Sequence, residues 1–350
     1  MSVSDSLQEV LSPEWLSSAL GRTFPGIRIR AVTPGHVTSR VSTNAQFRIE
    51  CDGDLPAGLP AGLCVKGYFT DCSDTALQSR AAGEPEANFY RELALGLDVR
   101  TLPCFFAEVD PLTHHGVVIT EDVEAGGATF LDALSPYSVD QAAHSLEQFA
   151  ILHGRTWAST RLSKAWLDPR LEHTFRARGL KEIRGNFEGP IGAGVPDDVR
   201  DPERLVETIR RLSPLLSAAD PLCLLHGDAH VGNIYLDAAG DPCLLDWQLV
   251  QRGPWFIDVG YHIGCAVGVE DRRQNEHDLL SHYLERLKIE GGLPPSWDGA
   301  WRSIALGMVY GFFLWAITLK VRPPVTTAML ERLGSAVADH DAYGVLLAVT

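Results

Sequence analysis

The chain has 350 residues, 45% of them hydrophobic, which is enough for a sizeable core in one large domain or two tightly joined lobes. Its net charge of −15 argues against a nucleic-acid-binding protein, because phosphate backbones are bound by basic patches. Seven scattered cysteines without a C-x-x-C pair indicate free thiols in a reducing cytosol, not disulfides or a zinc site, so we expect a cytoplasmic protein.

Neither a signal peptide nor a membrane span is expected. The first ten residues, MSVSDSLQEV, lack the basic and apolar regions of a signal peptide. The longest apolar stretch, 304–319, is shorter than a membrane span and is interrupted by Tyr310 and two glycines. We therefore predict a buried helix there and no membrane partner.

The first third of the chain has the pattern of an antiparallel sheet with one inserted helix. Ser12-Pro13-Glu14 is a typical helix start, with Gly21 as a plausible stop. A second helix is expected at about 79–95, where apolar residues recur at helical spacing. Turn-rich segments separate the short predicted strands, which are 27–32, 41–49, 63–69, 105–109 and 116–120.

After Val123 the pattern becomes mainly helical. One hairpin stands out, in which 233–236 and 242–246 flank a short turn with Gly240. The segment 162–202, rich in Arg, Gly and Pro, is predicted to be a surface excursion of unknown role. The predicted helices of this half are 141–159, 201–218, 272–287, 297–319 and 326–346.

The densest cluster of chemically capable residues is LLHGDAHVGNIYLDAAGDPCLLDWQ, residues 224–248. Because the turn folds the two strands together, Asn233 and Asp246 can point into one small volume. An amide oxygen beside a carboxylate is a ligand set that Mg²⁺ accepts, with phosphate oxygens and waters completing the octahedron. Asp228, five residues before Asn233, can then accept a proton from an attacking hydroxyl. Phosphoryl transfer requires these parts.

His226-Gly227-Asp228-x-x-x-x-Asn233, followed by Leu244-Leu245-Asp246-Trp247, resembles the signature of the aminoglycoside phosphotransferase/choline kinase-like family. The resemblance spans about 35–258 and implies an α+β, bilobal, protein-kinase-like fold. A small antiparallel-sheet lobe with one main helix, 1–122, would bind the nucleotide. A larger, mainly helical lobe, 123–350, would carry catalysis and bind the acceptor. ATP, or another nucleoside triphosphate, and Mg²⁺ would bind in the cleft.

The resemblance also implies roles for single residues. Asp228 would be the catalytic base, and Asn233 and Asp246 would hold Mg²⁺. His226 would be a structural residue of the catalytic loop, and Asp258 would hold that loop in shape, although by itself Asp258 is also compatible with a helix N-cap.

The two histidines around Asp228 leave a second class of function open. His226 and His230, at i and i+4 with a carboxylate between them, are compatible with a metal-dependent hydrolase. In the kinase interpretation His230 would instead line the loop beside the substrate.

The first third would have to supply the nucleotide site. Lys66 lies inside an apolar strand pattern, where an ammonium group is costly without a partner. Glu86 in E-x-x-F-Y matches the family helix and predicts a Lys66–Glu86 ion pair near the phosphates. Glu84 is the alternative partner, since Pro85 would then occupy the first turn of the helix.

The other nucleotide contacts are less specific. The loop 33–40 would cover the phosphates through Thr38 and Ser39, yet it carries one glycine and is not G-x-G-x-x-G. This departure leaves a nucleotide-binding pseudokinase as an alternative. Glu121, Asp122 and Val123 resemble the family hinge that binds adenine.

The acceptor is expected to be a hydroxyl of a small molecule, in contact with the C-terminal helices. An aromatic wall there could hold it, although such a stripe is more often core. Acids at 270, 271, 276 and 278 would suit an aminoglycoside, but a solvated helix face explains them equally well. The apolar composition around 297–319 favours a less polar alcohol. The candidate wall residues are Trp255, Tyr261, Trp301, Tyr310 and Trp315.

Overall fold

The computed structural model describes residues 3–39 and 41–349, which form two compact units. The sheet unit comprises Met1–Thr129 and Asp246–Gln248, and the helical unit comprises Phe130–Leu245 and Leu249–Thr350. The division of function at residue 122 stays a prediction.

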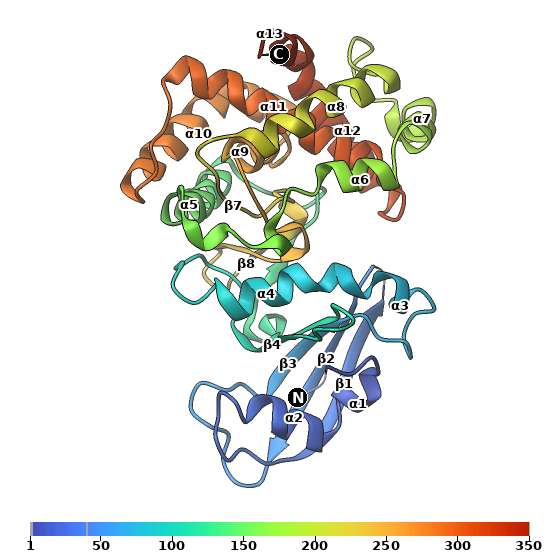
Figure 1. The fold of residues 1–350 in the computed structure, drawn as a ribbon, viewed down its shortest axis with the longest axis vertical. Helices are drawn as coiled ribbons and strands as arrows, with labels where there is room; N and C mark the ends of the chain where they lie inside the picture. The colour runs from blue at the N-terminus through green and yellow to red at the C-terminus, as the bar shows by residue number, and fades with distance from the viewer. Residues whose placement is uncertain (1–2, 40, 350) are drawn as a thin grey trace. The chain divides into compact units, whose positions relative to one another are not determined.

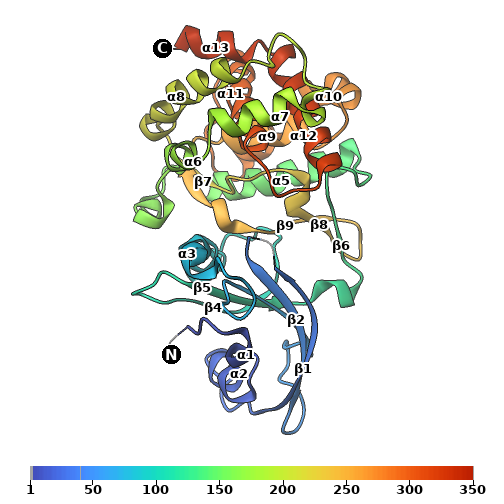
Figure 2. The ribbon, with the colours of Figure 1, turned by 90° about the vertical axis from the view of Figure 1, so that its right-hand side faces the viewer.

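A five-stranded antiparallel sheet forms the body of the sheet unit, in the order β1-β2-β3-β5-β4 (Figures 1 and 2). Alternate residues of β2 are buried, among them Phe47 and Ile49, because one face of the sheet packs on a core while the other faces solvent. The predicted sheet is therefore confirmed. Its strands are β1 (Ile29–Ser39), β2 (Thr43–Cys51), β3 (Gly62–Gly67), β4 (Cys104–Val109) and β5 (Gly116–Glu121).

Short helices complete the sheet unit. α2 begins after Ser12, whose hydroxyl accepts a hydrogen bond from the Trp15 amide, as the sequence predicts. The predicted helix at 79–95 begins later than expected, at Glu84, because Pro85 is tolerated only in a first turn. A 3-10 turn, Arg80–Gly83, precedes it. The helices are α1 (Leu7–Val10), α2 (Pro13–Leu20), α3 (Ala76–Ser79) and α4 (Glu84–Glu92).

The loop predicted at 33–40 is largely strand, which corrects the prediction. β1 continues to Ser39 and pairs with β2, with Thr38 opposite Asn44 and a register shift between Pro34 and Val37. The proline is accommodated because β1 is an edge strand and the ladder is irregular there. Arg40 lies outside the described residues.

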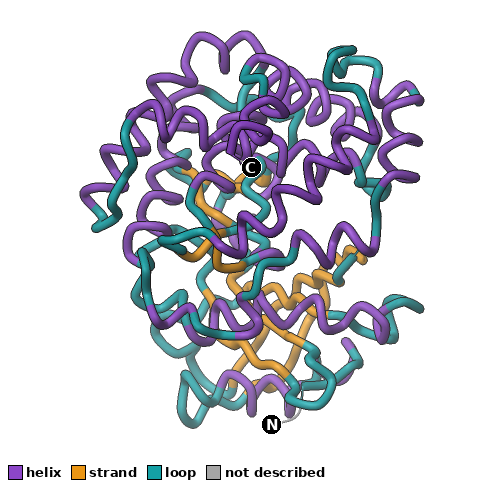
Figure 3. Tube along the Cα trace, turned by 45° about the horizontal axis from the view of Figure 1, so that its top comes forward, coloured by secondary structure: helices purple, strands orange, loops and turns teal. Residues whose placement is uncertain are grey.

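Helices make up most of the helical unit (Figure 3). The predicted hairpin is confirmed, with Tyr235 opposite Cys243, and a second short antiparallel pair, β7 with β10, was not predicted. The helix predicted at 326–346 is two helices. The elements are β6 (Thr129–Phe130, at the boundary of the units), α5 (Val139–Arg155), α6 (Leu171–Ala177), α7 (Leu180–Glu188), α8 (Pro202–Ala218), β7 (Cys223–Leu225), β8 (Ile234–Leu236), β9 (Pro242–Leu244), β10 (Gln251–Gly253), α9 (Phe256–Cys265), α10 (Val269–Ile289), α11 (Trp297–Ala316), α12 (Pro323–Asp339) and α13 (Ala342–Val349).

α9 and α11 cross at very short range because glycines face each other. A Cβ atom on Gly260 would lie 2.0 Å from the Ile304 carbonyl oxygen, and one on Gly307 would lie 2.1 Å from the Phe256 carbonyl oxygen. The apolar stretch predicted as a buried helix is α11, and its middle is buried. None of the helices within residues 3–39 and 41–349 is both long and apolar enough to cross a membrane.

We expect Gly307→Ala to lower the free energy of unfolding by about 1–3 kcal/mol, because the added methyl group overpacks the α9–α11 crossing. Gly185→Ala is the matched control within α7. A Cβ at Gly185 meets nothing within 4 Å, so this change should leave stability unchanged or raise it slightly. Urea denaturation measures both variants, and equal stability would contradict the close crossing.

Candidate active site

Lys66 of β3 is enclosed by two carboxylates of the sheet unit. Its Nζ lies 2.6 Å from Glu86 Oε2 and 2.8 Å from Asp246 Oδ1. Burial alone would lower the pKa of Lys66, but the two carboxylates outweigh it and raise the pKa above its ordinary value. The ammonium group therefore stays charged. Glu84, the alternative partner, instead lies 3.1 Å from His114 Nδ1.

Asp246 has a left-handed backbone, with φ +63°, which is uncommon for a residue other than glycine. The residue after it holds this conformation. The Trp247 ring stacks on Phe89 of α4 at 3.7 Å between centroids, and its Nε1 donates to Thr101 Oγ1 at 2.9 Å. Asp246 Oδ2 accepts no hydrogen bond from any described residue, so this oxygen can bind a cation.

The other predicted nucleotide contacts are spread over the sheet. Thr38 of β1 pairs with Asn44 of β2, and Asn44 pairs with Lys66 of β3. The three residues are therefore aligned across neighbouring strands. Ser39 Oγ is 3.2 Å from Thr43 Oγ1. Glu121 ends β5 opposite Leu63, three residues before Lys66 on β3. Asp122 Oδ1 accepts from the Gln46 side chain, and Val123 begins a 3-10 turn.

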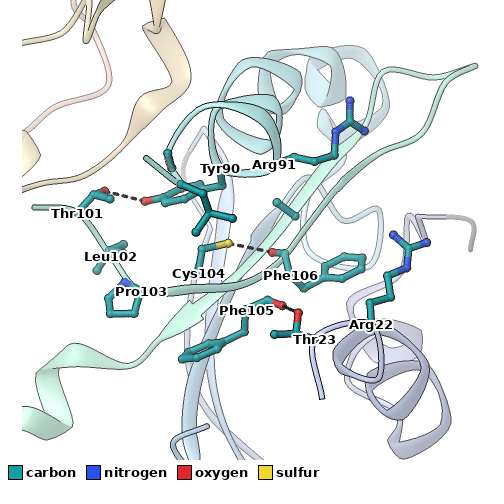
Figure 4. Close-up of a pocket in the computed structure, with 13 residues that line it drawn as sticks. Arg22, Thr23, Tyr90, Arg91, Thr101, Leu102, Pro103, Cys104, Phe105 and Phe106 are labelled. Carbon is teal, nitrogen blue, oxygen red and sulfur yellow. Dashed lines mark hydrogen bonds between the residues drawn. The ribbon is translucent and has the colours of Figure 1, made fainter. Parts of the chain in front are cut away.

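A cavity of about 380 Å³ in the sheet unit contains none of the predicted site residues (Figure 4). It lies along β4 beside the C-terminal part of α4, with Arg22 and Arg91 on its wall. The Tyr90 hydroxyl is 3.1 Å from Thr101 Oγ1, the atom that also binds Trp247. This cavity therefore adjoins the support of Trp247 and is not the predicted nucleotide site.

In the helical unit, one face of α9 binds consecutive residues of the 226–233 loop. Asp258 accepts hydrogen bonds from the His226 and Gly227 amides, at 2.6 and 2.9 Å. One turn later, the Tyr261 hydroxyl donates to Asp228 Oδ1 at 3.1 Å. Positions three and four apart share a helix face, which explains why one helix can bind consecutive residues of the loop.

His262, the next residue of α9, donates from Nδ1 to the Ala229 carbonyl oxygen at 3.0 Å. Burial lowers the pKa of His262 to about 4, so the ring is neutral. Asp258 is itself fully buried in the first turn of α9 and is not the N-cap of that helix. Its carboxylate also lies 3.2 Å from Nε2 of His153, a buried residue of α5.

His226 uses both ring nitrogens in hydrogen bonds to backbone groups. Nδ1 accepts from the Asp228 amide at 3.3 Å, so Nε2 carries the proton and donates to the Leu245 carbonyl oxygen at 2.9 Å. Neither nitrogen remains for a metal ion. Within the described residues, no group of three or more His, Cys, Asp or Glu side chains is arranged to hold one. The two hydrogen bonds of the His226 ring disfavour its use as a metal ligand in the hydrolase alternative.

Asp228 is surrounded by hydrogen-bond donors. Besides Tyr261, its carboxylate accepts from Asn233 Nδ2 at 3.1 Å, and His230 Nε2 lies 3.5 Å away. Burial raises the pKa of Asp228, but His230 and the Tyr261 hydroxyl outweigh it, so the pKa lies below its ordinary value. The carboxylate is ionised at neutral pH. Trp315 Nε1 in turn donates to the Tyr261 hydroxyl at 2.7 Å, which orients it.

Asn233 has its amide nitrogen occupied, because Nδ2 also donates to the Asp228 carbonyl oxygen at 2.9 Å. Its Oδ1 is the side-chain atom that remains for a cation. The Leu245 amide donates to the Asn233 carbonyl oxygen at 3.0 Å, and Asp246 follows Leu245 directly in the chain. Amide and carboxylate oxygens are both ligands that Mg²⁺ accepts, so each residue by itself has the chemistry of the predicted ligand.

Asp228 lines a cavity of about 250 Å³ within the helical unit. His230, Tyr261 and Trp315 line it as well, whereas Trp255, predicted for the same wall, stacks on Tyr283 at 5.3 Å. The lining residues are Thr174, Arg178, Asp228, His230, Leu249, Tyr261, Leu314, Trp315, Ile317, Thr318 and Val321.

Tyr310 and Trp301, the other aromatic candidates, do not line this cavity. The Tyr310 hydroxyl donates to the Gly227 carbonyl oxygen at 2.8 Å, and Trp301 packs beside His340. Sequence reasoning did not single out His153, which contacts Asp258, or Arg178, which lines the cavity. A histidine on the apolar face of α5 was a signal for the first, whereas Arg178 lies in the 162–202 segment, where no motif marks it.

A model of the phosphotransferase enzyme family, APH, matches residues 74–300, about two thirds of the sequence. The chain belongs to this family. Membership confirms the family predicted from the loop motifs and the predicted class, an ATP-dependent small-molecule kinase. No functionally curated protein matches the sequence significantly.

Solved structures of similar overall fold include a choline kinase from Cryptosporidium parvum, with 11% identity and a TM-score of 0.50 over 97% of this chain and 96% of that one. A choline kinase from Streptococcus pneumoniae has 14% identity and a TM-score of 0.48, covering 93% and 98%. A macrolide 2′-phosphotransferase from Brachybacterium faecium has 17% identity and a TM-score of 0.45, covering 92% and 98%. At such identities the likeness concerns the fold alone, and the predicted kinase-like α+β fold is confirmed.

We expect Asp258→Asn to lower the free energy of unfolding by about 1–3 kcal/mol, because the amide nitrogen cannot accept a backbone N–H and leaves one buried donor unsatisfied. Urea denaturation followed by tryptophan fluorescence measures the change. Asp278→Asn is the control, since that side chain is 90% exposed and should tolerate the change. Equal stability of the two variants would show that Asp258 does not hold the 226–233 loop.

Proposed function

We propose that this kinase transfers the γ-phosphoryl group of ATP to a hydroxyl group of a small molecule, with Asp228 as the base. The observation that carries the proposal is the setting of Asp228. Asp228 belongs to the characteristic loop of the family and lines a cavity. Its carboxylate is ionised and is oriented by Tyr261 and Asn233.

Asp228 would orient the acceptor and take its proton. A carboxylate has about four lone-pair sites, and Tyr261 and Asn233 occupy only part of them, so an acceptor hydroxyl can still donate to it. In the transfer, the acceptor oxygen bonds to the γ-phosphorus and the bond from that phosphorus to the bridging oxygen of ADP breaks. The proton of the hydroxyl passes to Asp228. His226 and Asp258 would support the loop without touching the reacting atoms.

Lys66 would bind the phosphates. An ammonium group has three N–H donors, and Glu86 and Asp246 engage two of them, which leaves one for a phosphate oxygen. The raised pKa keeps its charge available to stabilise the transferring group. Thr38 and Ser39 would lie near the phosphates, and Glu121, Asp122 and Val123 would supply the adenine contacts.

Asn233 Oδ1 and Asp246 Oδ2 would hold Mg²⁺, which when bound neutralises charge on the β- and γ-phosphates. On the acceptor side, His230, Tyr261 and Trp315 would contact the substrate, because they line the same cavity as Asp228. Trp255 would act through packing, since it stacks on Tyr283. A nucleotide-binding pseudokinase is the competing function.

We expect Asp228→Asn to lower the turnover number by about 10²–10⁴-fold with nucleotide binding retained, because the amide cannot take the proton. The assay is ADP release over a library of alcohols, sugars and antibiotics, with Asp278→Asn as an exposed control that should keep full activity. Near-normal turnover of Asp228→Asn would remove it as the base. Nucleotide binding without transfer by the unmodified protein would indicate the pseudokinase.

Bound MgATP should stabilise the folded protein, by about 2.7 kcal/mol at a ligand concentration of 100 times Kd. Chelation of Mg²⁺ should remove most of this effect, and so should Asp246→Ala, because one proposed oxygen ligand is lost. Thermal denaturation with and without MgATP measures it. Asp54→Ala, at an exposed position of the same unit, is the control that should keep the full stabilisation. A metal-independent shift would argue against the proposed ligands.

A further inference from the structure

The cavity at Asp228 is small for the acceptors that the sequence leaves open. Its volume of about 250 Å³ lies below the roughly 300–1,000 Å³ of pockets that enclose drug-sized ligands. A multi-ring antibiotic would extend well outside it. The cavity fits a compact alcohol.

The lining offers no counter-ion for a cationic acceptor. Asp228 is the one carboxylate among the lining residues that the structure describes, and it already accepts from Tyr261 and Asn233. The acidic cluster of α10 does not line the cavity. Its Glu276 lies 2.6 Å from Arg272 and 3.1 Å from His340. A polyammonium ligand would therefore be desolvated without compensation.

The aromatic side chains cannot form a cage for a quaternary ammonium group either. Such a cage requires open ring faces within about 6 Å of the cation. Tyr261 is fully buried and Trp315 is 6% exposed, with the His230 ring packed edge-on against the Trp315 ring at 5.1 Å. Little of either face is left for a ligand.

The two lining threonines have already used their hydroxyl hydrogens. Thr174 Oγ1 donates to the Arg170 carbonyl oxygen at 3.0 Å, and Thr318 Oγ1 donates to the Leu314 carbonyl oxygen at 2.8 Å. Both can therefore only accept from a ligand. The walls contributed by Leu249, Leu314, Ile317 and Val321 are apolar.

Arg178 is the lining group that can donate hydrogen bonds and carries a permanent positive charge. It directly follows α6 and is exposed, and its guanidinium group has no hydrogen bond or ion pair with any residue that the structure describes. Glu182, the acid that interacts with it electrostatically, accepts from the Gly179 amide at 2.9 Å. A guanidinium group binds carboxylate and phosphate oxygens in a bidentate manner.

We propose that the acceptor is a compact alcohol with an apolar body and one anionic group, a carboxylate or a phosphate, which Arg178 binds while the hydroxyl lies at Asp228. The inference rests on the kinase function proposed above, since it names the acceptor of the same site. It excludes cations of the choline and aminoglycoside type as preferred substrates.

The test compares alcohols of one chain length that differ only in their second end group. ω-Hydroxybutyrate, the terminal butanediol and ω-aminobutanol form one set, their hexane analogues a second, and choline is a further cation. ω-Phosphorylated butanediol distinguishes phosphate from carboxylate as the anion. ADP release with saturating MgATP gives kcat and KM for each compound. We expect kcat/KM to be highest for an anionic member.

Variants at Arg178 separate the two proposals. Arg178→Ala should lower kcat/KM for the anionic acceptor by about 10- to 100-fold, mainly through KM, and leave the diol unchanged, because a charge-assisted hydrogen bond is lost. Arg178→Glu should favour ω-aminobutanol. Arg211→Ala is the control, an exposed arginine of α8 that lies 2.9 Å from Glu207, and should change nothing.

Each outcome decides one of the proposals. Preference for a cation or a neutral alcohol, or turnover of the anion that is insensitive to Arg178, overturns the anionic acceptor and leaves the kinase function intact. Absence of transfer to every compound, although MgATP binds, contradicts the kinase function and the acceptor proposal that rests on it.

Discussion

The helical unit depends on one buried carboxylate. Asp258 accepts two successive backbone N–H groups, which forces the chain at His226 and Gly227 into a tight turn. Gly227 has φ +80° in that turn, and a Cβ there would lie 2.1 Å from the Leu249 carbonyl oxygen, so no other residue fits. With the turn set, the His226 ring reaches Leu245. Tyr261 is on the same face of α9 as Asp258 and donates to Asp228. The helix that shapes the loop therefore also orients the Asp228 carboxylate.

The sheet unit has a different constraint, which is an excess of negative charge. Lys66 faces two carboxyl groups, so acidic groups outnumber basic ones in this largely enclosed place, and burial raises the pKa of Glu86. Buried ion pairs are costly to desolvate and are often weaker than an apolar packing of the same volume. The group of Lys66, Glu86 and Asp246 is therefore better explained by a role in ligand binding than by a contribution to folding stability. Asp246, whose side chain is 35% exposed, is the member where a cation could balance the remaining charge.

Much of this could be predicted from sequence where a pattern is tied to local physics. A lysine inside an apolar strand requires a partner, and an acid on the following helix supplies it, so the Lys66–Glu86 contact was accessible. The turn with Gly240 predicts the β8–β9 hairpin. The length of the apolar stretch 304–319 predicts a buried helix there. The short strands β7 and β10 carry too few residues for a periodic signal. The family resemblance predicts Thr38 in a loop that covers the phosphates, whereas pairing with β2 extends β1 to Ser39. The catalytic roles stay predictions.

The residues around Asp228 come from two kinds of chain segment, one marked by a sequence motif and one without a motif. This difference explains why the acceptor is hard to predict from the sequence. The proposed base, Asp228, and the groups that hydrogen-bond to it come from the 226–233 loop and from α9. The distinguishing lining, Thr174 and Arg178, comes from the motif-free 162–202 segment, and Thr318 comes from the chain after α11. Substitutions in those segments alter the charge and volume of the cavity without disturbing a hydrogen bond to Asp228. One reaction centre can therefore serve chemically different alcohols, and membership of the family constrains the transfer step far more tightly than its acceptor.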